Sequence, residues 1–463
     1  MSIAPVFLSL TGVSDDERLF IERGVSQIGR YRIANEEALS FFEGSFVAQQ
    51  FGISIPPSMQ GVQTPVGWGG TVVESLEERL DWLGWHSEGD DFGLSDVYSD
   101  NMLDVESGLS HIDSLVFGTT FVMVGSGFDD EPHPLITSHS PLSMTGFWDR
   151  RTRRLTGALA VDGVGEGKTV TALRLGETTT YELRNGTWRV LERDQHRLDR
   201  IPVAMIPNRI RGSRETGRSE ITKPVRYYCE AAARTLLGME VSREFYNAPK
   251  VVGLNIAEDA FQNADGTPAS QWSAVQGRIW TLPPNEEGEA EPDVKQLTAA
   301  SPTPYLDQIK GYATYVAAEA GIPVTQFGFA TDNPPSADAI RAQESRLVKR
   351  AERRQTIFGR AWLEVGRLAL LIRDGEIPDT YSSTLTAKWR DAATPTRAAA
   401  ADEATKLVGA QILTADSSVT YDRVGLSPAE QKQIESDKKR QAGRAVLARV
   451  AATPGATDAP FVG

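Results

Sequence analysis

The segment from Gly321 to Asp374 constrains the fold more strongly than any other part of this 463-residue chain. The adjacent prolines Pro334 and Pro335 exclude a helix before Ser336, because proline fixes φ and restricts the residue that precedes it. Ser336 is a natural N-cap. A stripe of apolar side chains then recurs at helical spacing, and it consists of Ile340, Leu347, Ala351, Phe358, Trp362, Val365, Ala369 and Ile372. A helix that extends to Arg373 would be roughly 57 Å long at about 1.5 Å per residue, so we predict a structural strut rather than the wall of an enzyme pocket.

The overall charge restricts the possible partners. The formal net charge is −14, and tight, sequence-independent DNA binding requires neutralisation of phosphates. The acidic composition therefore argues against tight DNA binding, but it is compatible with DNA that moves past the protein without adhering to it. No run of about 18 apolar residues is present, so we expect no membrane span. We expect no secretory signal either, because the N-terminus has no basic segment ahead of an apolar one. The single cysteine, Cys229, fits a reducing compartment and is interpreted as a small core residue.

The N-terminal half mixes helices with antiparallel strands. Ser14 and Glu17 have the spacing of a capping box at the start of a helix, and residues 99–117 have a helical apolar pattern. Residues 120–206 are rich in Thr, Val and turn residues, and Asn185-Gly186 is a two-residue hairpin signal. We therefore predict an antiparallel β region there.

The C-terminal half is mainly helical. Helices are predicted over residues 219–247 and 304–320, and they bracket a small β insert at 249–300. The chain after 395 is predicted to be helical, with a disordered end. The fold class is therefore α+β.

No motif predicts enzyme chemistry. Gly163 to Thr169 superficially matches a phosphate-binding loop, but the first glycine is misplaced and a strand follows, so we interpret the segment as a glycine hairpin between strands. His133 and His139 lack the regular spacing of metal ligands. Nucleophile motifs are absent. We expect no catalytic residue, no metal and no cofactor.

The long helix carries a basic cluster with a local excess of five positive charges over Glu344 and Glu352. The cluster consists of Arg341, Arg346, Lys349, Arg350, Arg353, Arg354 and Arg360. The default interpretation is a solvated face with some pairing to nearby acids. The alternative is contact with nucleic acid or with an acidic neighbour in an oligomer, and of these two we favour the acidic neighbour.

Ordered motifs spread over most of the chain carry a family resemblance. They are Phe41-Phe42-x-Gly44; Trp68; Val72-Val73-Glu74-x-Leu76-x-Glu78-Arg79-Leu80; His111-x-Asp113-Ser114-Leu115-Val116-Phe117-Gly118; Ser140-Pro141; Ile201-Pro202-Val203; Pro207-Asn208-Arg209; Gly217-x-Ser219-Glu220-Ile221; Asn333-Pro334-Pro335-Ser336-Ala337-Asp338-Ala339-Ile340; and Glu344-x-Arg346-Leu347-Val348. In this order the chain resembles a tailed-bacteriophage portal protein, of the group found in siphophages of actinobacteria. The Phe-Phe pair stands where the family often has tyrosines.

The resemblance implies a portal fold with named parts. They are a wing (1–218), a first stem helix (219–248), a clip (249–300), a second stem helix (301–320), a tunnel loop (321–335), a long helix that returns to the wing (336–394) and a helical crown (395–463).

The resemblance also implies the function and the partners. Such proteins form rings, typically dodecamers, at the capsid vertex, and double-stranded DNA is packaged and ejected through them. The implied protein partners are the terminase large subunit, a head–tail adaptor, and the major capsid and scaffolding proteins. The implied location is the virion, with the host cytoplasm during assembly.

Three groups of candidate site residues follow from the resemblance. The candidates for the DNA tunnel are Gln326, Thr331, Asp332 and Asn333. The candidates for subunit packing are Val225, Cys229, Leu236, Leu347, Phe358 and Trp362. The candidates for partner docking at the clip are Asp265 and Trp280. Two rival interpretations remain, namely a phosphate- or nucleotide-handling enzyme built around Gly163–Thr169, and another structural protein of the virion head or tail.

Overall fold

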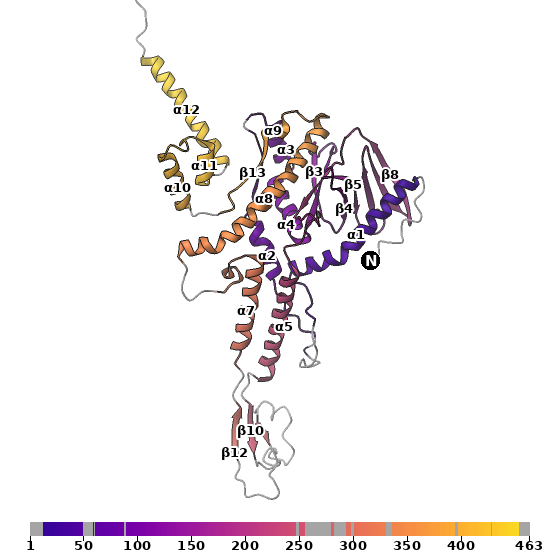
Figure 1. The fold of residues 1–463 in the computed structure, drawn as a ribbon, viewed down its shortest axis with the longest axis vertical. Helices are drawn as coiled ribbons and strands as arrows, with labels where there is room; N and C mark the ends of the chain where they lie inside the picture. Colours follow the sequence, from indigo (N-terminus) through magenta and orange to yellow (C-terminus); the bar gives the residue numbers. More distant parts are fainter. Residues whose placement is uncertain are drawn as a thin grey trace, which may run out of the picture. The chain divides into compact units, whose positions relative to one another are not determined.

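The computed structural model describes residues 13–49, 59, 61–87, 89–246, 250–254, 279–281, 293–297, 301–329, 336–393, 397–426 and 428–452. The chain divides into two compact units, Met1–Trp389 and Arg390–Gly463. Figure 1 shows that helices and antiparallel strands both build the first unit, which confirms the predicted α+β class. In the described ranges, every helix is too short or too polar to cross a membrane.

Helix α1 (Asp15–Phe42) packs on a five-stranded antiparallel sheet. Its predicted capping box is confirmed, because Ser14 Oγ accepts from the Glu17 amide and the Glu17 carboxylate accepts from the Ser14 amide. Gly24 lets the helix approach the sheet closely, since a Cβ there would lie 2.9 Å from Leu159 Cβ. In spatial order the strands are β4 (Met144–Asp149), β5 (Arg154–Asp162), β6 (Thr169–Arg174), β7 (Glu177–Arg184) and β8 (Thr187–Gln195).

The turns of this sheet match the predictions from the sequence. Asn185 and Gly186 both have positive φ, 50° and 70°, as a type I′ hairpin turn between β7 and β8 requires. The carboxylate of Glu166 accepts hydrogen bonds from both of their amides. The glycine segment that starts at Gly163 connects the paired antiparallel strands β5 and β6, so the predicted glycine hairpin is confirmed.

A smaller sheet joins the large sheet to the helices. Its spatial order is β3 (Leu135–His139), β2 (Thr119–Gly125) and β9 (Val203–Pro207). Phe121 and Met205 pack against Leu155 of the large sheet. The predicted helix at 99–117 is divided into α3 (Leu94–Asp100) and α4 (Leu103–Phe117), because Met102 between them has a φ of 47°, outside the helical range.

Strand β1 (Trp82–Ser87) pairs with β13 (Leu385–Trp389), and neither strand was predicted. Helix α2 (Trp68–Glu77) precedes β1, and the short helix α9 (Tyr381–Thr384) precedes β13. The pairing joins segments about 300 residues apart in the sequence, and sequence periodicity carries no information about such a contact.

Helices α5 (Lys223–Tyr246) and α7 (Thr303–Ala320) lie side by side (Figure 1). The rings of Tyr228 and Tyr315 stack between them at 5.2 Å. The chain between them contains β10 (Lys250–Leu254), β11 (Ile279–Thr281) and β12 (Asp293–Leu297), in the spatial order β11-β10-β12. These strands confirm the small β insert predicted at 249–300.

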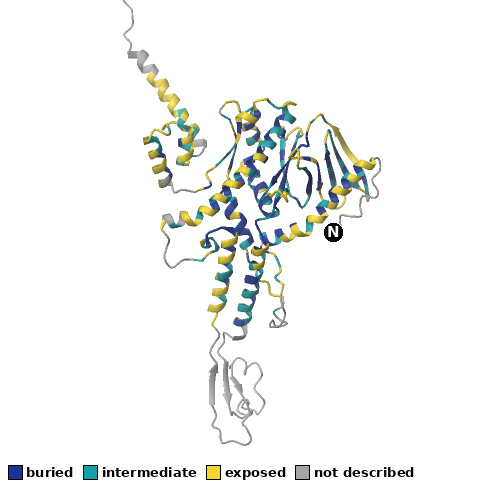
Figure 2. Cartoon of the chain, in the orientation of Figure 1, coloured by how far each residue is buried: buried dark blue, intermediate teal, exposed yellow. Residues whose placement is uncertain are grey.

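The long helix is confirmed as α8 (Ala337–Asp374), 38 residues long. Ser336 is its N-cap and accepts from the Ala339 amide, and Gly375 ends it with a φ of 79°. Figure 2 shows buried residues along its C-terminal half, where it crosses the small sheet.

The second unit is helical, as predicted. It contains α10 (Arg397–Gly409), α11 (Ser418–Val424) and α12 (Pro428–Ala452). Its described side chains are mostly exposed, and Ala400, Ala404 and Thr420 are among the few that are buried (Figure 2).

Candidate functional site: the Glu220 cluster

A buried carboxylate, Glu220, ties the start of α5 to the long helix α8. Its side chain has no accessible surface. Arg354 Nη2 lies 2.5 Å from Glu220 Oε1, and Arg350 Nη2 lies 2.5 Å from Oε2. Arg209 Nη1 adds a longer contact of 3.5 Å to Oε2. Asn208 Nδ2 donates to Oε1 at 3.1 Å, and Asn208 Oδ1 accepts from Arg354 Nε at 2.9 Å. These five residues are called the Glu220 cluster below.

The backbone around the cluster requires glycine at two positions. Gly217 has a φ of 74°, and a Cβ there would lie 2.0 Å from the carbonyl oxygen of Gly118. Gly118 has a φ of 95°, and a Cβ there would lie 2.7 Å from the backbone of Arg218. The close approach lets the Asn208 amide donate to the Gly118 carbonyl at 2.8 Å. The glycines of two motifs in the sequence therefore hold the loop that carries Glu220.

The electrostatics of the cluster are those of a compensated buried charge. Burial alone would raise the pKa of Glu220, but the charges of Arg350, Arg354 and Arg209 outweigh it, and the pKa is lowered from its usual value. Glu220 is therefore ionised in the folded protein at neutral pH. Removing one partner of such a buried pair leaves an uncompensated charge, which is strongly destabilising.

Further contacts join the same helices around the cluster. Thr222 Oγ1 donates to Glu319 Oε1 of α7 at 3.0 Å. Arg346 Nη1 of α8 donates to the carbonyl of Ala318 at 2.7 Å. Helices α5, α7 and α8 thus meet at one polar junction that can hold them in a fixed arrangement.

The junction changes the interpretation of the predicted basic cluster on the long helix. Arg350 and Arg354 point inward to Glu220, whereas Lys349 pairs with Glu352 on the surface at 2.7 Å. Arg353 and Arg360 are exposed. The predicted solvated face therefore describes only part of the basic cluster on α8, because Arg350 and Arg354 form ion pairs inside the same chain. The sequence motif contained Glu220, but no local pattern distinguishes a buried glutamate from a solvated one.

Five of the six predicted subunit-packing residues belong to the core of one chain. Each of Val225, Cys229, Leu347, Phe358 and Trp362 is at most 1% exposed in the isolated chain. They have no surface left for a neighbouring copy, so their assignment to subunit contacts is corrected. The apolar stripes that suggested an interface face inward. Leu236 alone is half-buried.

The remaining site predictions fall in or beside residues outside the described ranges. Gln326 lies in the short helix η4 (Val324–Phe327), and its amide oxygen is enclosed. That oxygen therefore does not face solvent in this structure. Thr331, Asp332 and Asn333 lie outside the described residues, as does Asp265. Trp280 lies in β11.

A buried aromatic group lies on α8 beyond the Glu220 cluster. Trp362 Nε1 donates to His111 Nε2 at 2.9 Å, and its ring stacks on Trp82 at 4.2 Å. Burial lowers the pKa of His111 to about 3. His111 is therefore neutral and acts as a hydrogen-bond acceptor.

His111 makes the stability depend on pH in a predictable direction. Its pKa is about 3 when folded and about 6.5 when unfolded. Between these values the unfolded chain binds the extra proton, so stability falls as pH falls. The His111→Gln variant lacks this titration. We expect the stability advantage of the parent over the variant to shrink by about 2 kcal/mol from pH 7 to pH 5, measured by urea unfolding. An unchanged advantage would contradict the buried neutral imidazole.

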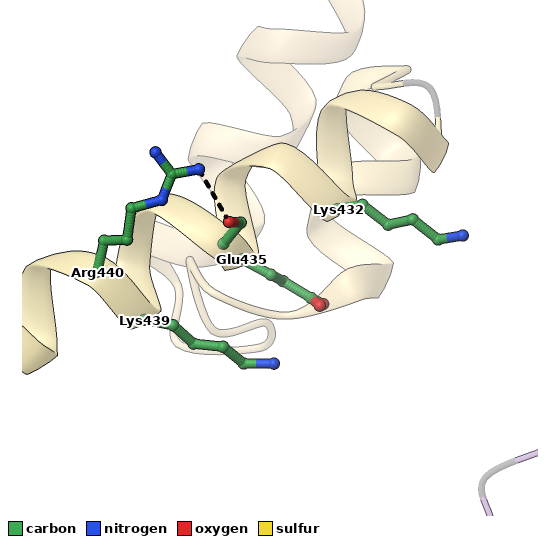
Figure 3. Close-up of a pocket in the computed structure, with 5 residues that line it drawn as sticks. Lys432, Glu435, Lys439 and Arg440 are labelled. Carbon is green, nitrogen blue, oxygen red and sulfur yellow. Dashed lines mark hydrogen bonds between the residues drawn. The ribbon is translucent and has the colours of Figure 1, made fainter.

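The structure offers no built chemical site at the surface hollow on α12 and no metal cluster among the described residues. Figure 3 shows a hollow on α12, where Lys432, Glu435, Lys439 and Arg440 all project from one helix, and Arg440 donates to Ser436 Oγ at 3.2 Å. Its lining comes from a single exposed helix. In the described ranges, no group of three or more His, Cys, Asp or Glu side chains is arranged to hold a metal ion.

Comparisons with known proteins identify the class. Residues 78–444 match the family model described as phage portal protein, SPP1 Gp6-like. The portal protein of Mycobacterium phage D29 is 33% identical over 384 residues, which cover 80% of this chain and 78% of that protein. The portal protein of Mycobacterium phage L5 is 32% identical with the same coverage.

Among solved structures, a chain from the neck of a native GTA particle, computed with C12 symmetry, matches with 12% identity and a TM-score of 0.43. The match covers 86% of this chain and 99% of that chain. The family-model match and the two sequence relatives define the class, a phage portal protein. The chain belongs to the SPP1 Gp6-like family of phage portal proteins.

Proposed function

We propose that this chain forms a ring, a dodecamer, at the capsid vertex and that double-stranded DNA enters and leaves the capsid through it. The observation that carries the proposal is membership of the portal family over residues 78–444. The order of elements supports it, since a helix pair brackets a small sheet and a capped 38-residue helix follows.

The parts of the chain take the corresponding roles in this proposal. The first 218 residues form the wing, α5 and α7 form the stem, and the insert between them forms the clip. Residues 321–335 form the tunnel loop, residues 336–394 form the long helix and its return to the wing, and residues 395–463 form the crown. The Glu220 cluster then fixes the stem to the wing. A rigid joint of this kind keeps the channel aligned while DNA moves through it.

The partners follow from these roles. The clip contacts the terminase large subunit during packaging and the head–tail adaptor afterwards, and the wing contacts the major capsid and scaffolding proteins. The protein acts in the host cytoplasm during assembly and at the portal vertex of the virion. The role is structural and needs no cofactor. The net charge of −14 suits a wall along which DNA must move without adhering.

Imaging of the purified protein tests the proposal. Negative-stain micrographs should contain rings with a central hole, and class averages should give the subunit count. Discs without a hole, or monomers at every concentration tested, would count against it. Micromolar nucleotide binding that is lost in Lys168→Ala would instead favour the rival enzyme.

Shortening the tunnel loop separates conduction from assembly. Deletion of Asp332 and Asn333 should leave rings intact, because the loop lies at the channel constriction in this proposal. Packaging or retention of DNA should fall by a factor on the order of ten in a complementation assay, which is the change that corresponds to about 1.4 kcal/mol if a single rate were affected. Loss of the rings themselves would show that the loop has a different place.

A further inference from the structure

The outward face of α8 forms one wall of an arginine-lined cleft, called the arginine cleft below. Its volume is about 880 Å³. Its floor is apolar, with Ile210, which is 46% exposed, and the half-buried Trp148 and Ile357. It follows β9, an edge strand of the small sheet. Seven arginines and two glutamates line it. The cleft therefore combines an apolar floor with a strongly positive rim.

In the described part of the chain, three of these arginines have no carboxylate within ion-pair distance, namely Arg153, Arg211 and Arg360. Arg150, Arg200 and Arg367 pair with Glu215, Asp199 and Glu364. Arg154 lies close enough to Asp199 for its charge to act on that carboxylate. Unpaired arginines around an apolar floor are typical of a surface that binds a partner with both acidic and apolar side chains.

The exposed face of α4 carries the complementary features. Val105 and Leu109 are 60% and 51% exposed and lie four positions apart on one face of the helix. Met102, the residue just before α4, is 64% exposed. These three residues are called the α4 ridge below. Exposed apolar stripes on a folded surface usually mark an interaction site.

Acidic side chains without partners flank the α4 ridge. Glu106 follows Val105 on the helix, and Glu77 lies beside it, because a Cβ on Gly108 would lie 3.3 Å from Glu77 Oε1. Burial first, and then the charges of Asp81, Glu78 and Glu74, raise the pKa of Glu77. In the described ranges, Glu77 and Glu106 form no ion pair. The ridge therefore matches the cleft in both apolar character and charge.

The ridge and the cleft lie on opposite sides of one subunit. Successive residues of an α-helix are about 100° apart, so residues two positions apart point in nearly opposite directions. Leu109 on the ridge therefore points away from His111, and Arg360 in the cleft points away from Trp362. His111 and Trp362 are hydrogen-bonded to each other at 2.9 Å between α4 and α8. The ridge of a copy cannot reach its own cleft.

We infer that the α4 ridge of one copy seats in the arginine cleft of the next copy. This inference rests on the proposed ring, and it names the two surfaces that build the ring. A head-to-tail contact between unlike surfaces continues from copy to copy until the rotation closes. Met102, Val105 and Leu109 would cover the floor, and the glutamates would pair with Arg153 and Arg360. A DNA backbone would satisfy the arginines but leave the floor uncovered.

Two variants test the pairing, one with a disrupted ridge and one with a disrupted cleft, and they are called the blocked variants below. The ridge variant carries Val105→Arg and Leu109→Arg, and the cleft variant carries Arg153→Glu and Arg360→Glu. All four side chains are exposed in the isolated chain, so the fold should persist, as thermal melting of each variant would verify. The matched controls are Val164→Arg, in an exposed turn, and Arg353→Glu, which is exposed on α8 but does not line the cleft.

The expected result in sedimentation velocity is specific to a head-to-tail contact. Each blocked variant alone should remain monomeric, while the parent and both controls form rings. A mixture of the two blocked variants should form 1:1 dimers and nothing larger, because only one intact ridge and one intact cleft remain. Rings from either blocked variant, or a mixture that stays monomeric, would overturn the inference even if the parent forms rings. Dimers in the mixture without rings from the parent would instead refute the proposed ring and keep the contact.

Discussion

Glu220→Gln should lower the free energy of unfolding of this protein far more than the substitution of a carboxylate on the surface. The change removes the negative charge but leaves Arg350 and Arg354 held around it, with Arg354 itself 7% exposed. Breaking a buried ion pair by removing one partner costs about 3–5 kcal/mol. We expect a loss in this range in urea unfolding at pH 7, measured at one fixed protein concentration because oligomerisation alters apparent stability.

An exposed glutamate on α8 itself, Glu352, provides the matched control. Glu352 pairs with Lys349 at 2.7 Å, and both side chains are about half exposed or more. Exposed pairs contribute at most about 1 kcal/mol, so Glu352→Gln should change stability little. A Glu220→Gln protein as stable as the Glu352→Gln protein would refute the compensated buried charge. A double-mutant cycle with Arg354→Met would then measure the coupling directly.

The sequence was sufficient to predict the parts of the fold that depend on local signals. The capping box at Ser14, the Asn185-Gly186 turn and the N-cap at Ser336 each fix backbone geometry within a few residues. Such features are encoded by side chains that bond to their own neighbourhood, and they can be read without tertiary information. The boundaries of α8 were therefore predicted almost to the residue.

Features that depend on distant segments could not be predicted in the same way. The pairing of β1 with β13 joins two tryptophan-containing segments that are far apart in the sequence. Glu220 is surrounded by arginines that lie about 130 residues later in the chain. Helical periodicity located the apolar stripe of α8, but periodicity cannot tell whether a stripe faces the same chain or another copy. The stripe was assigned to a subunit contact for that reason, and its burial corrects the assignment.

Trp362→Ala tests this correction, with an expected loss as large as that of Glu220→Gln. Trp362 is 1% exposed, stacks on Trp82 and accepts a hydrogen bond on its carbonyl oxygen from Trp85 Nε1. Truncation of a buried tryptophan or phenylalanine to alanine costs about 3–5 kcal/mol through lost transfer energy and a residual cavity. It also leaves the acceptor nitrogen of buried His111 without its donor.

The dependence on protein concentration distinguishes the two roles of Trp362. Truncating a core residue destabilises the monomer. The loss of unfolding free energy should therefore be measurable at protein concentrations too low for the parent to assemble, and it should be the same at higher concentrations. An interface residue would leave the dilute protein unchanged and weaken only assembly. Trp362→Phe should lose less, because the stacked ring is retained while the Nε1–H donor is lost. Tyr227→Ala on α5, where the side chain is largely exposed, is the matched aromatic control and should cost little. If Trp362→Ala and Tyr227→Ala melt alike in dilute solution, the stripe belongs at an interface after all.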